Sequence, residues 1–132
     1  MIDSMASTIL IIDDDADDME LTVIAIESLR PDVKVQSAYG GREAIDLIHA
    51  GHPLPNLILL DLKMPGMNGI DTLSELRRDD RLSRIPVVVV TSSSLESDRS
   101  ASLDAGANDF MHKAFDMTAF SLEMEAVLSK YL

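Results

Sequence analysis

The sequence predicts an α/β fold, in which a doubly wound parallel sheet of five strands is covered by five helices. Two observations indicate it: short apolar runs, several closed by an acidic residue, and intervening segments whose apolar residues recur at helical spacing. The connections are short, so right-handed crossovers are expected to place helices on both faces of the sheet. In such sheets the chemistry gathers at the carboxyl ends of the strands.

The first strand and helix follow a short N-terminal segment. Residues 8–13 form an apolar run that ends in an acid, as in a strand buried on both faces. Apolar residues then recur at helical spacing over 16–30, and Asp15 lies at the N-cap position. Residues 1–7 are expected to be a flexible lead before a domain that covers 8–132.

The middle of the chain repeats this alternation twice. Residues 33–38 form a β-branched strand, and a second helix is expected within 41–51, between glycine breaks. Residues 57–61 form another apolar run closed by an acid. A Pro-Gly turn at 65–66 and then Gly69 precede the third helix, which contains the next apolar residues at helical spacing.

The last two units complete the pattern. Residues 86–91 (PVVVVT) give the strongest strand signal of the sequence, and the serines at 92–94 are expected to cap a helix over 95–105. Residues 109–113 predict a fifth strand, and 117–132 predict an amphipathic closing helix.

The composition is that of one folded domain. The chain has 132 residues, 46% hydrophobic and 26% charged. It has no cysteine, which excludes disulfide bonds, a thiolate nucleophile and a cysteine zinc site. Nothing requires an oxidising compartment, so a cytoplasmic location is expected. No apolar run approaches the roughly 20 residues that a membrane helix needs, so no membrane contact is expected.

The charge balance is strongly acidic. Eleven basic residues against 23 acidic ones give a formal net charge of −12. Such a domain repels phosphate backbones, so direct binding of nucleic acid is not expected. Proteins are the expected partners.

Five polar residues stand at the predicted carboxyl ends of strands: Asp13, Asp14, Asp61, Thr91 and Lys113. Parallel strands bring these ends to one rim of the sheet. Three carboxylates held close together repel one another, unless a hard divalent cation that prefers oxygen ligands neutralises them. The cluster therefore predicts a metal site, with Mg²⁺ (or Mn²⁺) as the expected ion.

Four segments in order, ILIIDDD, LILLDLKMPGMNG, PVVVVTSSS and AGANDFMHKAF, resemble the successive signatures of the response-regulator receiver family. Each segment alone is a weak signal, whereas four with this order and spacing are specific. The resemblance covers residues 8–132 and implies the flavodoxin-like fold of CheY-like receivers. It also implies a two-component signalling protein rather than an enzyme with turnover.

The resemblance implies roles for the residues at the rim. Asp61 would be the phosphoacceptor, and Asp14 and Asp61 would bind the metal directly, together with the backbone carbonyl of Lys63. Asp13 would act largely through a metal-bound water. Physical chemistry supports this set, because positioning, a divalent cation and an ammonium suffice for phosphoryl transfer through a loose transition state.

The other matching positions concern the phosphoryl group and its lifetime. Lys113 and Thr91 would stabilise the phosphoryl oxygens, and Thr91 and Phe110 would form the switch pair. Lys63 and Ser93 occupy the positions that flank the approach of hydrolytic water in this family. A long cation at Lys63 predicts obstruction of that water, and hence slow hydrolysis.

One position departs from the family pattern. Most receivers have proline after the lysine, in a cis peptide bond, whereas Ala114 follows Lys113 here. A cis bond before alanine costs roughly 2.5–4 kcal/mol, so this loop is expected to be trans or strained, and less rigidly set than usual.

Other polar residues are expected to be structural. Negative groups near a helix N-terminus are favoured by its dipole, so Asp15, Asp17 and Asp18 are interpreted as capping or solvated residues. The histidines are assigned no role, because none has a ligand spacing with a carboxylate partner; they are His49, His52 and His112.

The expected phosphodonor is a sensor histidine kinase or a phosphotransfer protein. The signal would pass to a target protein, or to a second copy in a homodimer, through the last two helices and last strand. No output module follows residue 132, which suggests a stand-alone receiver, although a fragment of a longer protein would show the same sequence pattern.

Two other functions fit parts of the pattern. A magnesium phosphohydrolase with an aspartyl-phosphate intermediate would need a second acid where Lys63 stands, and a substrate-capping insertion. An adaptor that works without phosphorylation would be expected to lose acids or the lysine, and this chain keeps them. The receiver is the preferred interpretation.

Overall fold

The computed structural model describes residues 7–51, 53–64, 66–93, 95–113 and 116–132, and it confirms the predicted alternation of strands and helices. Within these residues the elements are β1 (Thr8–Ile12), α1 (Ala16–Leu29), β2 (Lys34–Ala38), α2 (Gly41–His49), β3 (Leu57–Leu60), α3 (Gly69–Arg78), β4 (Val87–Thr91), α4 (Glu96–Asp104), β5 (Asp109–His112) and α5 (Met117–Tyr131). None of these helices is both long and apolar enough to cross a lipid bilayer.

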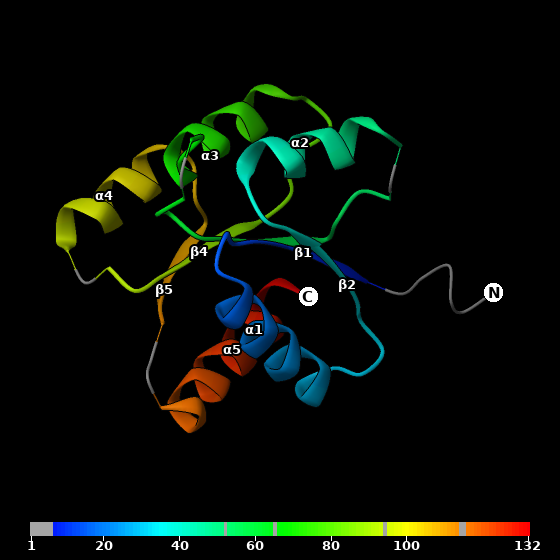
Figure 1. Ribbon diagram of the computed structural model, residues 1–132, viewed down its shortest axis with the longest axis vertical. Coiled ribbons are helices and arrows are strands. Elements are labelled where there is room, and N and C mark those ends of the chain that lie inside the picture. Colours follow the sequence, from blue (N-terminus) through cyan, green and yellow to red (C-terminus); the bar gives the residue numbers. More distant parts are fainter. Residues whose placement is uncertain (1–6, 52, 65, 94, 114–115) are drawn as a thin grey trace.

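The strands form one parallel sheet in the order β2-β1-β3-β4-β5. Helices α1 and α5 cover one face, and α2, α3 and α4 cover the other (Figure 1). The chain leaves β1 toward β2 on one side and returns to β3 on the other. The strand order therefore reverses between β1 and β3, the point at which doubly wound sheets form their sites.

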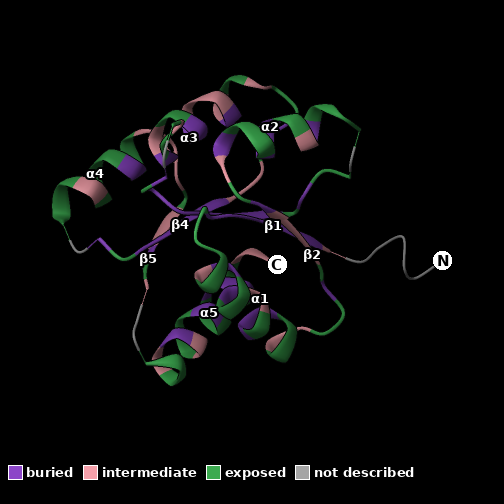
Figure 2. Cartoon of the chain, in the orientation of Figure 1, coloured by how far each residue is buried: buried purple, intermediate pink, exposed green. Residues whose placement is uncertain are grey.

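The core consists of two apolar clusters, one on each side of the sheet. Alternate residues of a strand point to opposite faces, so Ile9 and Ile11 pack against α1 and α5, whereas Leu10 and Ile12 pack against α2 and α3. Every residue of β1, β3 and β4 is buried, as Figure 2 shows along the middle of the sheet. This confirms the prediction of strands buried on both faces.

Three strands end one residue earlier than predicted. β1 ends before Asp13, β3 before Asp61 and β5 before Lys113. The three charged residues therefore begin the loops at the rim. The predicted flexible lead lies outside the described residues except for Ser7, whose carbonyl accepts a hydrogen bond from the Lys34 amide at 2.9 Å.

The apolar faces of two helices differ from the prediction. In α1 the buried residues are Met19, Thr22, Ala25 and Ile26, so Leu21 and Ile24 lie on the outer flank, 43% and 46% exposed. In α5, which was predicted to be amphipathic, the apolar Leu122 is 64% exposed. Each helix packs through a narrow stripe of four buried residues, at 19, 22, 25 and 26 in α1 and at 120, 124, 127 and 128 in α5, which leaves apolar residues beside the stripe uncovered.

Helix caps agree with the prediction at α1 but not at α4. The Asp15 carboxylate accepts hydrogen bonds from the amides of Asp17 and Asp18, as an N-cap does. The N-cap of α4 is Leu95, whose side chain cannot cap. Ser93 replaces it from two residues away, since its hydroxyl accepts from the Leu95 amide and donates to the Asp98 carboxylate.

A single arginine joins three segments at the amino end of the sheet. The Arg77 guanidinium, on α3, donates to the carbonyls of Gly106 and Ile85 at 3.0 and 2.8 Å, and to the Asn108 side-chain oxygen at 2.9 Å. Asn108 also accepts from the Val87 amide that begins β4. The planar guanidinium thus satisfies loop carbonyls that have no partner in a helix or strand.

The loop from β3 to α3 is folded tightly against the rim. The Gly69 amide donates to the Leu62 carbonyl at 2.9 Å, which closes the loop at the start of α3. Met64 anchors its middle, because its side chain is buried in the cluster beneath α2 and α3. A Cβ at Gly69 would lie 2.6 Å from Leu62 Cα and would also collide with the Asp61 carbonyl oxygen.

We predict that Gly69→Ala destabilises the domain by about 1–3 kcal/mol, since backbone atoms must move to admit the methyl group. Gly40→Ala is the matched control, because a Cβ there meets no atom within 4 Å and the backbone is extended. Its free energy of unfolding should change by less than about 1 kcal/mol. Urea denaturation of both variants measures the difference, and equal stabilities would contradict the packing argument.

Candidate functional site

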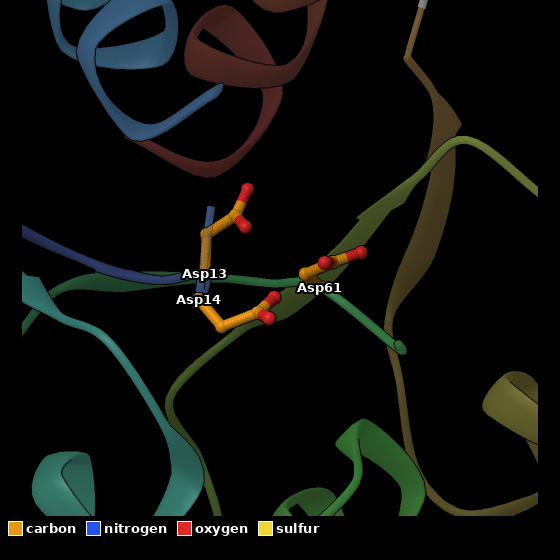
Figure 3. A group of neighbouring side chains, drawn as sticks. All are labelled: Asp13, Asp14 and Asp61. Atoms are coloured by element: carbon orange, nitrogen blue, oxygen red, sulfur yellow. The ribbon is translucent and has the colours of Figure 1, made fainter. Parts of the chain in front are cut away.

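Three carboxylates meet where β1 and β3 end. Oxygen atoms of Asp13, Asp14 and Asp61 lie within 4.8 Å of one another. Asp13 and Asp61 are buried, at 3% and 7% exposure, whereas Asp14 is exposed. Figure 3 shows the carboxylates of Asp14 and Asp61 turned toward the same space, with Asp13 beside them. The cluster therefore has two buried members and one side open to solvent.

Backbone hydrogen bonds set the positions of the buried acids. The Asp61 amide donates to the Ile12 carbonyl at 2.9 Å, which continues the β1–β3 ladder by one residue. The Asp13 carboxylate accepts the Asp15 amide at 3.0 Å through Oδ1, and this leaves Oδ2 to face the sheet rim. Pairing of β1 with β3 thus brings together acids that lie 48 positions apart.

Lys113 supplies the positive charge at this rim. Its Nζ lies 2.9 Å from Asp13 Oδ2, 2.9 Å from Asp18 Oδ2 and 3.7 Å from Asp61 Oδ2. The Lys113 amide also donates to the Thr91 carbonyl at 2.8 Å, which extends the β4–β5 ladder. All five residues predicted to meet at the rim are therefore gathered there.

Asp18 is a contact that the sequence analysis missed. It was interpreted as a capping or solvated residue, and that prediction is wrong for its side chain, which binds Lys113. The signal available in the sequence was weak, because Asp18 is one of three acids near the start of α1. Only the fold shows that it faces the end of β5. The same interpretation holds for Asp15, which is the N-cap.

The sequence matches the response regulator receiver domain over residues 9–125. The chain belongs to the response regulator receiver family. It is a receiver domain of two-component signal transduction, with the CheY-like, flavodoxin-like fold that the sequence predicted.

Known proteins resemble the receiver in sequence and in structure. It is 35% identical over 124 residues to the DNA-binding dual master transcriptional regulator RpaA of Synechocystis, an alignment that covers 92% of this chain and 49% of RpaA. The crystal structure of the phosphorylated cyanobacterial phytochrome response regulator RcpA superposes with a TM-score of 0.88, at 27% identity and 96% and 94% coverage. The Mn²⁺-bound response regulator Rcp1 superposes with a TM-score of 0.84, at 29% identity and 93% and 92% coverage.

The lengths of these relatives differ. The receiver spans about half the length of the curated relative RpaA. It spans nearly the whole of the RcpA and Rcp1 chains. The activity of a longer relative such as RpaA is that of a protein with sequence outside the aligned region.

The receiver's electrostatics distinguish Asp61 from ordinary carboxyl groups. Burial raises the pKa of Asp61 to about 6, and the neighbouring negative charges of Asp13 and Asp14 act in the same direction, against the attraction of Lys113. Burial acts to lower the pKa of Lys113, but hydrogen bonds to Asp18 and Asp13 outweigh it and hold that pKa well above its ordinary value. Lys113 is thus a permanent cation beside an acid that is costly to ionise.

The residues expected to sense the phosphoryl group occupy β4 and β5. Thr91 is fully buried at the end of β4, and its hydroxyl oxygen accepts the Ser93 amide at 3.3 Å. His112 Nε2 lies 3.1 Å from the Ser92 carbonyl, which ties the β4–α4 loop to β5. Phe110 is half-buried and lines a cleft of about 490 Å³ between α4 and α5.

Some residues that the sequence predicted at the site make no contact with the carboxylate cluster among the contacts described above, or lie outside the described residues. Lys63 lies in the loop after β3 with its side chain exposed, and its roles in metal binding and hydrolysis stay predictions. The Ser93 hydroxyl donates to the Asp98 carboxylate and accepts from the Leu95 amide, so it also has a structural role. The Lys113–Ala114 peptide bond lies outside the described residues, as does His52.

The carboxylate cluster fits a hard divalent cation. Oxygen ligands on opposite sides of Mg²⁺ lie about 4 Å apart, close to the spacing within the cluster. The donor set is oxygen only, which suits Mg²⁺ or Mn²⁺ and not a soft metal. Exposed Asp14 gives the ion a route from solvent.

We predict that Asp61→Asn raises the melting temperature of the metal-free receiver by several degrees at neutral pH. The pKa of Asp61 is about 6 when folded and 3.8 in its ordinary environment, so the folded state holds the proton more tightly. The stability that protonation adds is complete below about pH 4 and is lost as the pH rises through 6.

The gap between the variant and the wild type should therefore narrow as the pH falls from 7 to 4. Thermal unfolding in a chelating buffer measures it. Asp46→Asn, at an exposed carboxyl group of α2, is the control and should show no such trend. A gap that stays constant with pH would contradict the assignment of the buried charge to Asp61.

Proposed function

We propose that this receiver accepts a phosphoryl group on Asp61 from a sensor histidine kinase or a phosphotransfer protein. One observation carries the proposal: the buried Asp61 carboxylate is grouped with Asp13 and Asp14 in a set suited to a divalent cation, and it lies 3.7 Å from the ammonium of Lys113. Asp61 also follows β3, next to the point at which the strand order reverses. This is the carboxyl-end rim of the sheet, where a donor can reach it. A carboxylate so placed can act as a nucleophile without an acid–base histidine.

The transfer step is a displacement at phosphorus. An Oδ atom of Asp61 forms a bond to phosphorus as the bond from phosphorus to the donor histidine nitrogen breaks. The electron pair of the broken bond stays on that nitrogen, which takes a proton from solvent. Asp61 is left as an acyl phosphate, with the phosphoryl oxygens facing Lys113 and the hydroxyl of Thr91.

The proposed metal ligands are Asp13, Asp14 and Asp61, with the Lys63 backbone carbonyl. When bound, Mg²⁺ or Mn²⁺ would offset the negative charge of the phosphoryl oxygens. The Lys113 ammonium, 3.7 Å from Asp61, would offset the same charge. Because Lys113 is charged at every pH in cells, its contribution does not depend on proton transfer.

We propose that occupancy of Asp61 is passed to α4, β5 and α5. Thr91 and Phe110 lie on neighbouring strands, and Phe110 opens onto the cleft between α4 and α5. Leu95 and Leu122 leave apolar surface exposed on these helices. A target protein or a second copy of the receiver is the proposed partner there. The net charge of −12 argues against direct contact with nucleic acid by this domain.

The receiver is proposed to be a signalling domain that catalyses its own phosphorylation and loses the group slowly. A phosphohydrolase of the aspartyl-phosphate type would carry an acid two residues after Asp61, where this chain has the exposed Lys63. Incubation with a phosphomonoester separates the two, since a phosphohydrolase turns over many equivalents and a receiver does not.

We predict that acetyl phosphate and Mg²⁺ place one phosphoryl group on the wild-type receiver, measured by intact-protein mass spectrometry. Asp61→Asn should abolish this label, because its amide is not a nucleophile, and a chelator should suppress labelling of the wild type. Asp104→Asn, at an exposed carboxyl group of α4, should label normally. Persistent labelling of Asp61→Asn would refute the assignment.

We also predict that the phosphorylated receiver decays severalfold faster in Lys63→Asn than in the wild type. The exposed Lys63 side chain lies two residues after the phosphoacceptor, where a shorter side chain would leave more room for water. Lys34→Asn, at an exposed lysine of β2, is the control for the loss of charge. Decay at an equal or slower rate in Lys63→Asn would exclude obstruction by the lysine.

A further inference from the structure

Asp18 contacts Lys113 without belonging to the carboxylate cluster. Its Oδ2 atom lies 2.9 Å from Lys113 Nζ, the same distance that separates this ammonium from Asp13. The contact joins the first turn of α1 to the end of β5, 95 positions along the chain. Asp18 is therefore a third anionic partner of the lysine, beside Asp13 and Asp61.

Hydrogen bonds hold the backbone of Asp18 in the first turn of α1. The Asp18 amide donates to the N-cap carboxylate of Asp15 at 3.0 Å. Its carbonyl accepts the hydroxyl of the buried Thr22 at 2.9 Å. Both backbone groups of Asp18 are thus engaged in the first turn of α1, from which its carboxylate reaches Lys113.

The three acids do not contact the Lys113 ammonium equally closely. An ammonium has three protons to donate, and the two contacts at 2.9 Å are hydrogen bonds, whereas Asp61 at 3.7 Å is an ion pair beyond hydrogen-bond distance. Lys113 is thus drawn toward Asp13 and Asp18 and away from the acceptor.

The two hydrogen-bonded acids also differ in burial. The Asp13 side chain is 4% exposed and that of Asp18 is 39% exposed. A buried carboxylate that loses its cation is left unpaired at high cost, whereas an exposed one is rehydrated. When phosphoryl oxygens compete for Lys113, Asp18 is the partner that can be released.

We propose that Asp18 is a positioning residue that holds Lys113 back in the unphosphorylated receiver and competes with the phosphoryl group for its ammonium. This inference rests on the proposed phosphorylation of Asp61. On this proposal Asp18 slows the phosphorylation of Asp61. Lys113 contacts Asp18 before the transfer and exchanges this partner for a phosphoryl oxygen afterwards.

The test compares the rate of labelling by acetyl phosphate and Mg²⁺ in Asp18→Asn and Asp17→Asn. Both variants remove one negative charge from the first turn of α1, and in the described residues the Asp17 carboxylate makes no hydrogen bond or ion pair. A partly exposed ion pair supports a change of up to about fivefold. Asp18→Asn should therefore label about threefold faster than the wild type, and Asp17→Asn at close to the wild-type rate.

A second variant and a second measurement separate positioning from a change in folding. Asp18→Ala removes the acceptor altogether and should label at least as fast as Asp18→Asn. Without metal or phosphodonor, the Lys113 ammonium protons should exchange with water faster in both Asp18 variants than in Asp17→Asn, as measured by ¹⁵N NMR. Unchanged exchange would overturn the proposal.

The outcomes distinguish this inference from the proposed function. If the wild type takes no label, the phosphoacceptor proposal fails. If the wild type labels while the Asp18 variants label at the rate of Asp17→Asn, or more slowly, Asp18 does not restrain the lysine and the inference alone fails. Slower labelling would show that Asp18 prepares Lys113 for transfer instead.

Discussion

The arrangement of this rim depends on the attraction between one ammonium and the carboxylates that the sheet forces together. Pairing of β1 with β3 places Asp13 and Asp61 side by side in a buried position, where like charges are costly. Lys113 offsets part of that cost by binding Asp13 and approaching Asp61. The remaining excess of negative charge favours a divalent cation. The proposed metal binding and the proposed phosphoryl transfer thus rest on the same imbalance of charge.

The location of this lysine determines which parts of the domain respond to it. Lys113 directly follows β5, and its amide continues the ladder to the buried Thr91. Its side chain reaches α1 through Asp18, on the opposite edge of the site. One side chain therefore joins Asp61, the last strand and the first helix. A change in its partners alters the contacts of all three.

Much of the fold could be predicted from the sequence because the signals were local. Apolar runs closed by acids mark buried strands whether or not the partners are known, and Asp15 is recognisable as a cap from its place before α1. The convergence of Asp13, Asp61 and Lys113 follows once the strands are parallel. What could not be predicted depends on packing: Leu122 is exposed because α5 buries a narrow stripe, and the N-cap of α4 is Leu95 and not one of the serines before it. The partner of Asp18 is of this second kind, since no local pattern relates it to a residue at the end of β5.

The Arg77 hydrogen bonds give the two ends of the sheet different mechanical properties. At the amino ends of β4 and β5, a guanidinium joins α3 to the loop before β4 and the loop before β5, through two backbone carbonyls and the Asn108 side-chain oxygen. At the carboxyl ends, backbone hydrogen bonds of the Asp61 and Lys113 amides are joined by ionic side-chain contacts of Lys113. A displacement at the amino ends must therefore break hydrogen bonds to one guanidinium, whereas the partly exposed pair of Lys113 with Asp18 can be exchanged while the backbone ladders stay intact.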